Sequence, residues 1–278
     1  MLSQLLTYPL KFLLKFKPIR ERLAFGFVHH HFDDLKLTIP LTNNLAVPVP
    51  HTIALKSFSE IYIANDYGDF LKHMPLPKRW LDLGCHMGYF SLYLIWQHAL
   101  KSGDWVGTTN AEGALLIDAD PRVFKQLNRV IDRNLLQGKF QTLNAAVAPP
   151  DQTSITFALR SGMVSSIDKS GDPIIKEVTV PRLSSESILS RLKPPYDLIK
   201  MDIEGAEFRF LEDFPEILKD TQALLLEWHG WGSDTDAEER IQALTAKLGF
   251  KPPIVLKERE CYHSTAGELY AGNHLYLR

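Results

Sequence analysis

The chain has 278 residues, of which 45% are hydrophobic and 23% are charged, and its formal net charge is −2. This composition is typical of a soluble globular protein, and it excludes a disordered chain and a strongly basic surface for nucleic acid. The two cysteines, Cys85 and Cys261, exclude a disulfide-stapled scaffold and a cysteine-rich zinc site. The sequence holds no run of about 18 uncharged apolar residues that would predict a membrane-spanning helix.

Residues 1–23 combine apolar and basic side chains, and Pro9 and Pro18 interrupt any long helix there. The basic residues interrupt and follow the apolar run, whereas a signal peptide carries them before it. We expect one or two short helices that cap the main domain, with peripheral membrane contact through a basic amphipathic segment as the alternative. Residues 1–56 are expected to form an N-terminal extension, helical and then irregular or in short strands, before a single domain over residues 57–278.

From about residue 75 onward, strand-like and helix-like segments alternate, which predicts an α/β fold with a mainly parallel sheet. The expected core strands are 80–83, 114–117, 140–147, 196–201 and 223–228, followed by an edge hairpin of 252–260 and 269–277. The expected helices are 88–101, 121–137, 184–192, 204–211 and one that begins near 235. The segments 153–159 and 174–180 predict two more strands, antiparallel to each other. The core is therefore expected to hold about seven strands in doubly wound order.

Local signals mark the ends of two helices. Asp120 and Pro121 are typical of an N-cap and a first helical residue, and Gly138 is typical of a C-terminal cap. Residues 235–238 have the spacing of a capping box, and that helix is expected to end near Gly249.

Residues Asp82 to Gly88 connect the first strand to the first helix, at the edge where parallel sheets bind ligands. Gly84 and Gly88 do not complete the dinucleotide-binding pattern, because His86 and Tyr89 stand where glycines would admit a pyrophosphate. An acid and few glycines better suit a ligand with an ammonium group and a neutral sugar, such as S-adenosylmethionine. The alternative is a tight turn that binds no ligand.

Two acids, Asp118 and Asp120, lie at the end of the second strand. An acid at this position can accept hydrogen bonds from both hydroxyls of a ribose. The two residues compete for this role, and Asp120 can also act only as an N-cap. Their separation from the first motif exceeds the usual roughly 20 residues, and we interpret residues 102–113 as an insertion that accounts for the excess.

A third group of acids, Asp202, Glu204 and Glu207, follows an apolar strand and surrounds Gly205. Carboxylates at the carboxyl end of a strand are placed for a ligand, and their mutual repulsion raises pKa values toward those useful in a general base. The alternative is that they complement the dipole of the next helix, which explains Glu204 or Glu207 more easily than Asp202.

The sequence resembles the FkbM family of S-adenosylmethionine-dependent methyltransferases over about residues 57–230. The resemblance rests on residues 80–91, 117–121 with the helix that follows, 143–148 and 198–208, of which the last segment is the most specific. Residues 224–230 also look like the next strand of that family. Cys85 and His86 depart from the usual Ala-Asn of the family, Asp120 replaces its usual Glu before proline, and Ser184 replaces an Asp.

The resemblance implies a seven-stranded, doubly wound, Rossmann-like fold of the class I methyltransferase type, with residues 57–278 as the methyltransferase domain. It implies S-adenosylmethionine as cofactor and O-methylation of a hydroxyl in a sugar, a glycan or a secondary metabolite. It also favours Asp120 over Asp118 as the ribose ligand. The cofactor-binding residues it implies are Glu60, Asp82, Gly84, Cys85, His86, Gly88, Tyr89, Ser91, Asp118, Asp120, Asn144 and Ala145. Glu60 and Tyr67 are assigned to the methionine end of the cofactor, with a packing role as the alternative.

Methyl transfer is an in-line displacement that depends on positioning the acceptor oxygen, with a general base to take its proton. The expected catalytic residues are Asp202 and Glu204, followed by Glu207 and His229. The alternative for His229 is a structural role, and Lys200 is expected to be structural or to pair with the acids. Asp202, Glu204 and Glu227 could together hold Mg²⁺, but we do not favour a divalent metal and assign no residue as a metal ligand.

Two other functions remain open: an NAD-dependent oxidoreductase, which the missing glycine pattern disfavours, and a non-catalytic cofactor-binding protein of the same fold. A nucleic-acid methyltransferase is disfavoured because residues 202–205 replace its Asp/Asn-Pro-Pro-aromatic signature and no dense basic patch is visible. The expected partner is a small-molecule or glycan acceptor, contacted by the loops 160–173, 230–236 and 261–268. Cys85 is expected to be a free thiol, which suits a reducing cytoplasm.

Overall fold

The computed structural model describes residues 37–42, 44–102, 110–160, 174–232, 234, 236–264 and 267–278. The predictions for residues 1–23 and for nearly all of the loop 160–173 lie outside these residues. In the described part of the chain, no helix has both the length and the apolar character needed to cross a bilayer.

The main sheet has the strand order β10-β11-β9-β8-β3-β4-β5. Its strands are β3 (Arg79–Leu83), β4 (Gly113–Asp118), β5 (Phe140–Asn144), β8 (Leu198–Met201), β9 (Ala223–Trp231), β10 (Ile254–Ser264) and β11 (Gly267–Leu277). The pairs from β5 across to β9 are parallel, whereas β11 is antiparallel to both β9 and β10. The seven-stranded, doubly wound α/β fold is therefore as predicted. The expected edge hairpin is formed by β10 and β11, and the last strand, β11, lies between β9 and β10.

Two smaller hairpins accompany the main sheet. The first joins β1 (Leu37–Pro40) to β2 (Ala46–Val49), and the second joins β6 (Ser154–Arg160) to β7 (Ile174–Pro181), as the sequence predicted for the latter. After β2 come α3 (Thr52–Phe58), a π-helical turn (Ser59–Ala64) and a 3-10 helix (Gly68–Lys72). Val47, Val49 and Ala54 belong to the same buried cluster as α4, so this part of the N-terminal region packs onto the main domain.

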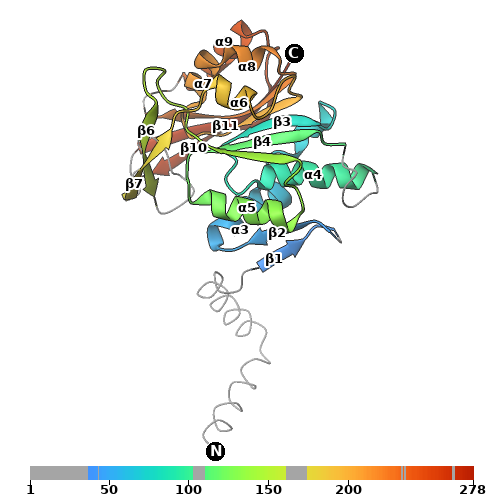
Figure 1. The fold of residues 1–278 in the computed structure, drawn as a ribbon. Coiled ribbons are helices and arrows are strands. Elements are labelled where there is room, and N and C mark those ends of the chain that lie inside the picture. The colour runs from blue at the N-terminus through green and yellow to red at the C-terminus, as the bar shows by residue number, and fades with distance from the viewer. Residues whose placement is uncertain are drawn as a thin grey trace, which may run out of the picture.

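Helices cover both faces of the sheet (Figure 1). They are α4 (Tyr89–Ser102), α5 (Val123–Arg133), α6 (Ser185–Leu189), α7 (Glu207–Asp213), α8 (Pro215–Lys219) and α9 (Ala237–Lys247). One apolar cluster joins α4 and α5 to the sheet, and a second joins α6, α7, α8 and α9 to its other face. Because helices cover both faces, side chains on both sides of the core strands are buried, and the strands therefore read as continuous apolar runs.

The second long helix is shorter than predicted at both ends. Residues Asp120 to Arg122 form a turn, and α5 begins only at Val123. At its other end the Asn134 side chain donates to the carbonyl oxygens of Val130 and Ala46, at 2.8 and 2.9 Å. These bonds occupy the last turn of the helix, and Gly138 lies beyond it, so the prediction of Gly138 as the cap was wrong.

Two further boundaries differ from the prediction. Residues 204–206 form a turn, and α7 begins at Glu207 because the preceding Glu204 and Gly205 have positive φ. The strand β9 continues to Trp231, three residues past its predicted end at Trp228. This extension carries His229 on a strand and so fixes its position relative to Glu227.

Candidate functional site

The candidate site lies where the strand order reverses. β3 pairs with β4 on one side and with β8 on the other, so the carboxyl ends of these three strands meet at the switch point of the sheet. A pocket opens at this edge. Its lining residues come from the ends of the parallel strands and from the β6–β7 region: Leu83, Gly84, His86, Ile117, Asp118, Ala119, Asp120, Val123, Ala145, Ala146, Val147, Phe157, Leu183, Asp202, Ile203, Glu204 and Ala206.

Gly84 is required for the close contact between the loop after β3 and the end of β8. It has φ +70°, and a Cβ atom at this position would lie 1.7 Å from the carbonyl oxygen of Asp202. Its amide nitrogen and that of Cys85 donate to the carbonyl oxygen of Ile117, at 2.9 and 3.1 Å. The loop is therefore held against both neighbouring strands, and only a glycine fits at its centre.

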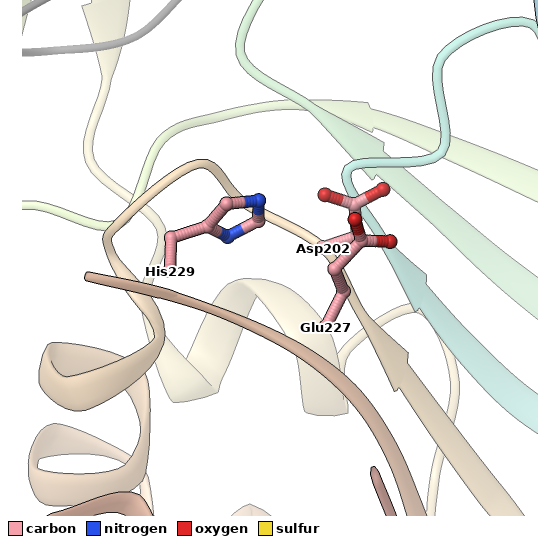
Figure 2. Close-up of side chains that lie close together, drawn as sticks. All are labelled: Asp202, Glu227 and His229. Atoms are coloured by element: carbon pink, nitrogen blue, oxygen red, sulfur yellow. The ribbon is translucent and has the colours of Figure 1, made fainter. Parts of the chain in front are cut away.

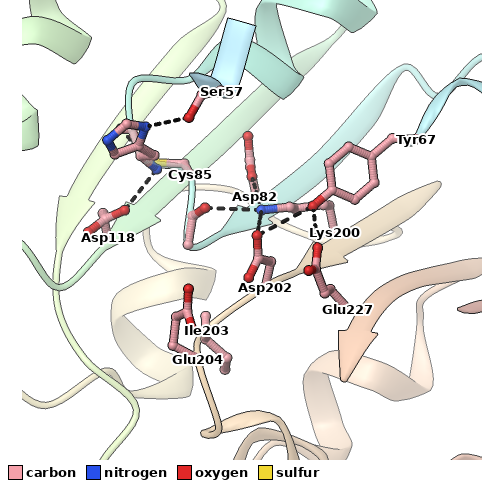
Figure 3. Close-up of polar contacts among 12 residues, drawn as sticks. Ser57, Tyr67, Asp82, Cys85, Asp118, Lys200, Asp202, Ile203, Glu204 and Glu227 are labelled. Carbon is pink, nitrogen blue, oxygen red and sulfur yellow. Dashed lines mark hydrogen bonds and ion pairs between the residues drawn. The ribbon is translucent and has the colours of Figure 1, made fainter. Parts of the chain in front are cut away.

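Asp82 supports this loop from beneath. Its carboxylate is fully buried and accepts a hydrogen bond of 2.6 Å from Ser91, whose oxygen in turn accepts from the Trp80 indole. Burial raises the pKa of Asp82, although Lys200 lowers it. Lys200 lies 3.8 Å from Asp82 and donates to the carbonyl oxygen of Gly84 at 3.0 Å (Figure 3). Asp82 thus orients the loop through its neighbours and does not line the pocket.

Asp118 and Asp120 both line the pocket but have different partners. The two oxygens of Asp118 accept from the backbone nitrogens of His86 and Asp120, each at 2.8 Å (Figure 3 shows the former). Burial raises the pKa of Asp118 to about 6, although these backbone bonds lower it. The carboxylate of Asp120 is bound by the guanidinium of Arg122 at 2.6 to 3.0 Å. Asp118 therefore joins the two loops, whereas Asp120 forms a local ion pair.

A cluster of ionisable residues lies beside the pocket, and its member Asp202 lines the pocket. Asp202 follows β8, and Glu227 and His229 are alternate residues of β9. The hydroxyl of Tyr67 donates to Glu227 at 2.7 Å and to Asp202 at 3.4 Å, and Lys200 lies 3.5 Å from Asp202 (Figure 3). Burial, and next the Asp202 carboxylate, raise the pKa of Glu227 to about 7. The predicted pairing of Lys200 with the acids is confirmed by these distances.

His229 is held by a carboxylate from another element. Its Nδ1 atom lies 2.9 Å from Glu207, which is fully buried at the start of α7 and also accepts from the backbone nitrogens of Ile203 and Gly205. Nε2 of His229 faces Glu204 at 3.8 Å. Burial lowers the pKa of His229, but the neighbouring acids Glu207, Glu204 and Glu227 together outweigh burial, so the pKa lies well above its usual range. Burial raises the pKa of Glu204 to about 7, although His229 lowers it.

Comparison with known proteins identifies the family. The family model described as the methyltransferase FkbM domain matches residues 96–252, which is more than half of the chain. The chain belongs to the FkbM methyltransferase family. The matched range runs from within α4 to the residues after α9, and so includes the strand ends that carry Asp118, Asp202 and His229.

The solved structures that are similar to this FkbM methyltransferase are distant from it in sequence. The N-terminal domain of EvdMO1, solved in the presence of SAH and D-fucose, is 13% identical, with 77% of this chain and 82% of that chain covered and a TM-score of 0.43. TehB from Haemophilus influenzae is 16% identical (80% and 65% covered, TM-score 0.43), and the precorrin-6y C5,15-methyltransferase from Geobacter metallireducens is 8% identical (77% and 86%, TM-score 0.41). The search of curated proteins found no match.

The residues predicted for cofactor binding fall into two groups in this FkbM methyltransferase. Those that line the pocket are Gly84, His86, Asp118, Asp120 and Ala145. Those that do not line it are Glu60, Asp82, Cys85, Gly88, Tyr89, Ser91 and Asn144. Members of the second group support the first: Gly88 packs against Leu127 and Leu116, and Asn144 donates to the carbonyl oxygens of Asp118 and Ala119 at 2.9 and 3.0 Å.

Glu60 and Tyr89 also lie away from the pocket lining. Glu60 pairs with Lys56 at 3.6 Å, and burial raises its pKa, although Lys56 lowers it. The Tyr89 hydroxyl donates to the carbonyl oxygen of Pro48, which ties α4 to β2. Of the predicted catalytic residues, Asp202 and Glu204 line the pocket, while Glu207 and His229 lie directly behind them.

Sequence reasoning missed the apolar part of the pocket. Phe157 lies on β6, Val123 begins α5 and Leu183 lies between β7 and α6, and no motif connects them. We predicted Phe157 to lie in a pair of antiparallel strands, 153–159 and 174–180. Nothing in the sequence indicated that this hairpin lies beside the ends of β4 and β5.

Proposed function

We propose that this chain is an S-adenosylmethionine-dependent O-methyltransferase that acts on a hydroxyl of a sugar, a glycan or a secondary metabolite. One observation carries the proposal: a single pocket at the switch point has apolar walls and two carboxylates at one end, and an acid cluster backed by a buried histidine at the other. Membership of the FkbM family supports methyl transfer, and the site chemistry supports the finer assignment.

The residues present fit this cofactor by the chemistry of their side chains. Phe157, Val147 and Leu183 offer an apolar surface suited to an adenine ring. Asp118 offers carboxylate oxygens for the ribose hydroxyls, and Asp202 offers negative charge for the amino group and the sulfonium. We assign the ribose to Asp118 ahead of Asp120. The guanidinium of Arg122 binds both oxygens of Asp120 as an ion pair, whereas each oxygen of Asp118 accepts one backbone hydrogen bond and keeps a second lone pair for a ribose hydroxyl.

When bound, the cofactor supplies a methyl group on a positively charged sulfur. The task of the protein is then to hold the acceptor oxygen in line and to receive its proton. Glu204 lines the pocket, and its positive φ of 53° turns it away from the helical path of α7. The Glu207–His229 pair lies behind it, with Nε2 of His229 3.8 Å from Glu204. Although burial raises the pKa of Glu204, the positive charge of His229 lowers it and so favours the ionised form that accepts a proton. We assign Glu204 as the general base and Glu207 as a positioning residue.

Calorimetry with S-adenosylhomocysteine and with NAD⁺ tests the cofactor assignment. We expect wild-type protein to bind S-adenosylhomocysteine and not NAD⁺. Asp118→Asn should weaken this binding at least about tenfold, while Asp120→Asn should weaken it by less than about threefold. Binding of NAD⁺ alone would overturn the proposal, and equal losses in the two variants would overturn the preference for Asp118.

An activity screen tests the acceptor class. Protein with S-adenosylmethionine is incubated with a panel of free sugars, glycans and hydroxylated metabolites, and formation of S-adenosylhomocysteine is followed. We expect turnover with at least one hydroxyl acceptor, and expect Glu204→Gln to lose turnover without losing cofactor affinity. Tight cofactor binding without transfer to any acceptor would favour a non-catalytic cofactor-binding protein.

A further inference from the structure

Three side chains with metal-binding atoms converge beside the pocket. One ligand atom each from Asp202, Glu227 and His229 lies within 4.8 Å of the other two. Glu227 and His229 are two apart on β9 and so point to the same side of the strand, toward Asp202 at the end of the neighbouring β8. Figure 2 shows the imidazole ring of His229 facing the two carboxylates.

His229 has the arrangement that a metal-ligating histidine requires. Its Nδ1 atom is hydrogen-bonded to the Glu207 carboxylate at 2.9 Å, and its side chain is only 4% exposed. Among the described residues, nothing lies within hydrogen-bond distance of Nε2, whose nearest ionic neighbour is Glu204 at 3.8 Å. A carboxylate on one ring nitrogen fixes the ring and leaves the other nitrogen directed at a ligand, as in carboxylate–histidine–metal sites.

Each of the two carboxylates is also held through one oxygen only. Tyr67 donates to Oε2 of Glu227 at 2.7 Å, and Oδ2 of Asp202 faces Tyr67 at 3.4 Å and Lys200 at 3.5 Å. In the described part of the chain, no donor reaches Oε1 of Glu227 or Oδ1 of Asp202. Each of the three residues is therefore oriented by a neighbour that contacts one of its polar atoms, and its second polar atom has no hydrogen bond in the described part of the chain. This is the pattern of a preorganised ion site.

The charges around the cluster also favour a cation. Three carboxylates, Asp202, Glu204 and Glu227, lie close together, and Lys200 is the one lysine or arginine paired with any of them among the described residues. Lys200 additionally faces Asp82 and donates to a backbone carbonyl. Repulsion among these partly buried carboxylates is costly, and a divalent cation that replaces the Nε2 proton of His229 adds one positive charge among them.

We propose that Asp202, Glu227 and His229 bind one divalent cation with a preference for mixed oxygen and nitrogen ligands, such as Mn²⁺. Ligand atoms around one ion at about 2.1 Å are at most about 4.2 Å apart, so small inward movements of the side chains complete the site. His229 stands in this set in place of Glu204, which the alternative considered from the sequence had grouped with Asp202 and Glu227. The role of the ion, orienting the acceptor hydroxyl and lowering its pKa, rests on the proposed function.

Paramagnetic resonance with Mn²⁺ as the probe tests the site directly. Chelator-treated full-length protein is titrated with MnCl₂, free Mn²⁺ is measured from its solution signal, and pulsed spectra report ¹⁴N coupling to the bound ion. We expect one bound ion per chain with coupling to a nitrogen. His229→Gln should abolish the coupling, and Glu227→Gln should weaken binding at least about tenfold.

A matched control is available elsewhere in the fold. Glu238 lies 3.2 Å from the buried His274, so Glu238→Gln alters a similar Glu–His pair outside the cluster and should leave Mn²⁺ binding unchanged. Circular dichroism of each variant, compared with wild type, checks that it is folded. If His229→Gln does not fold, the nitrogen coupling in the wild type and the loss of affinity in Glu227→Gln still test the site.

The outcomes separate this proposal from the proposed function. Absence of Mn²⁺ binding, or binding without nitrogen coupling, overturns the cation site, and S-adenosylhomocysteine binding in the same sample would then leave the methyltransferase proposal intact. Nitrogen-coupled Mn²⁺ binding that Glu227→Gln weakens supports the cation site. The same result in protein that binds no S-adenosylhomocysteine supports the cation site and counts against the proposed cofactor.

Discussion

Nδ1 of His229, on β9, lies 2.9 Å from a carboxylate oxygen of Glu207, on α7. That oxygen also accepts from two backbone nitrogens of the turn after β8. One buried carboxylate therefore fixes both the turn that presents Glu204 and the ring that faces it. This contact joins α7 to β9, which are not consecutive in the sequence.

Removing the charge of Glu207 should impair the orientation and basicity of His229. We expect Glu207→Gln to lower turnover about 10- to 100-fold and to leave S-adenosylhomocysteine affinity within about threefold of wild type. The pKa of His229, followed by NMR of the ring protons, should fall. Glu212→Gln, an exposed acid on the same helix, is the control and should change neither quantity. Unchanged turnover in Glu207→Gln would show that the pair is only structural.

Gly84→Ala should destabilise the domain and weaken cofactor binding. The new methyl group meets the Asp202 carbonyl, and φ of +70° is itself unfavourable for alanine. We expect a loss of about 2 to 4 kcal/mol in the free energy of unfolding, measured by urea denaturation. Gly138→Ala is the control, because nothing lies within 4 Å of its added Cβ. A Gly84→Ala protein as stable as wild type would contradict the close contact between the two loops.

Cofactor affinity should depend on the protonation of Asp118. Its pKa is raised to about 6, so the carboxyl group is ionised at neutral pH and gains a proton as the pH falls through that value. The protonated group accepts hydrogen bonds from ribose less well. Affinity for S-adenosylhomocysteine should therefore fall about tenfold between about pH 7 and about pH 5, as measured by calorimetry. Asp118→Asn should lack this dependence, and a wild-type affinity that is flat over this range would argue against the ribose role.

Tyr67→Phe should weaken the support of Glu227. The hydroxyl of the buried Tyr67 donates to Glu227 at 2.7 Å, and its loss leaves a partly buried carboxylate with one donor fewer. We expect a loss of roughly 1 to 3 kcal/mol in unfolding free energy at neutral pH, together with reduced turnover. Tyr93→Phe is a control at a buried tyrosine whose hydroxyl has no hydrogen bond among the described residues. Equal effects of the two substitutions would mean that the Glu227 contact adds nothing specific.

The sequence was sufficient to predict the sheet and the edge of the sheet at which the site forms. Continuous apolar runs such as 114–117 mark buried parallel strands, and the acids after them mark the strand ends. Their convergence follows from the fold class alone, which is why Asp118, Asp202 and Glu204 were all expected there and all line the pocket.

Contacts between distant elements could not be predicted in this way. The end of α5 depends on Asn134 bonding to Ala46, which lies 88 residues away, and no local pattern contains that information. The same holds for Tyr67, whose partners Asp202 and Glu227 follow it by 135 and 160 residues. The contact between Glu207 and His229 could not be predicted either, because it depends on how α7 packs against β9.

The position of β11 has a consequence for how this domain folds. The strand lies between β9 and β10, and it pairs antiparallel with both along most of its length. During synthesis, β9 is therefore an unprotected edge until residues 267–277 have been made. An exposed strand edge invites pairing with other chains. We expect fragments that stop before β11 to aggregate, and refolding of the whole chain to be limited by this late, non-local pairing.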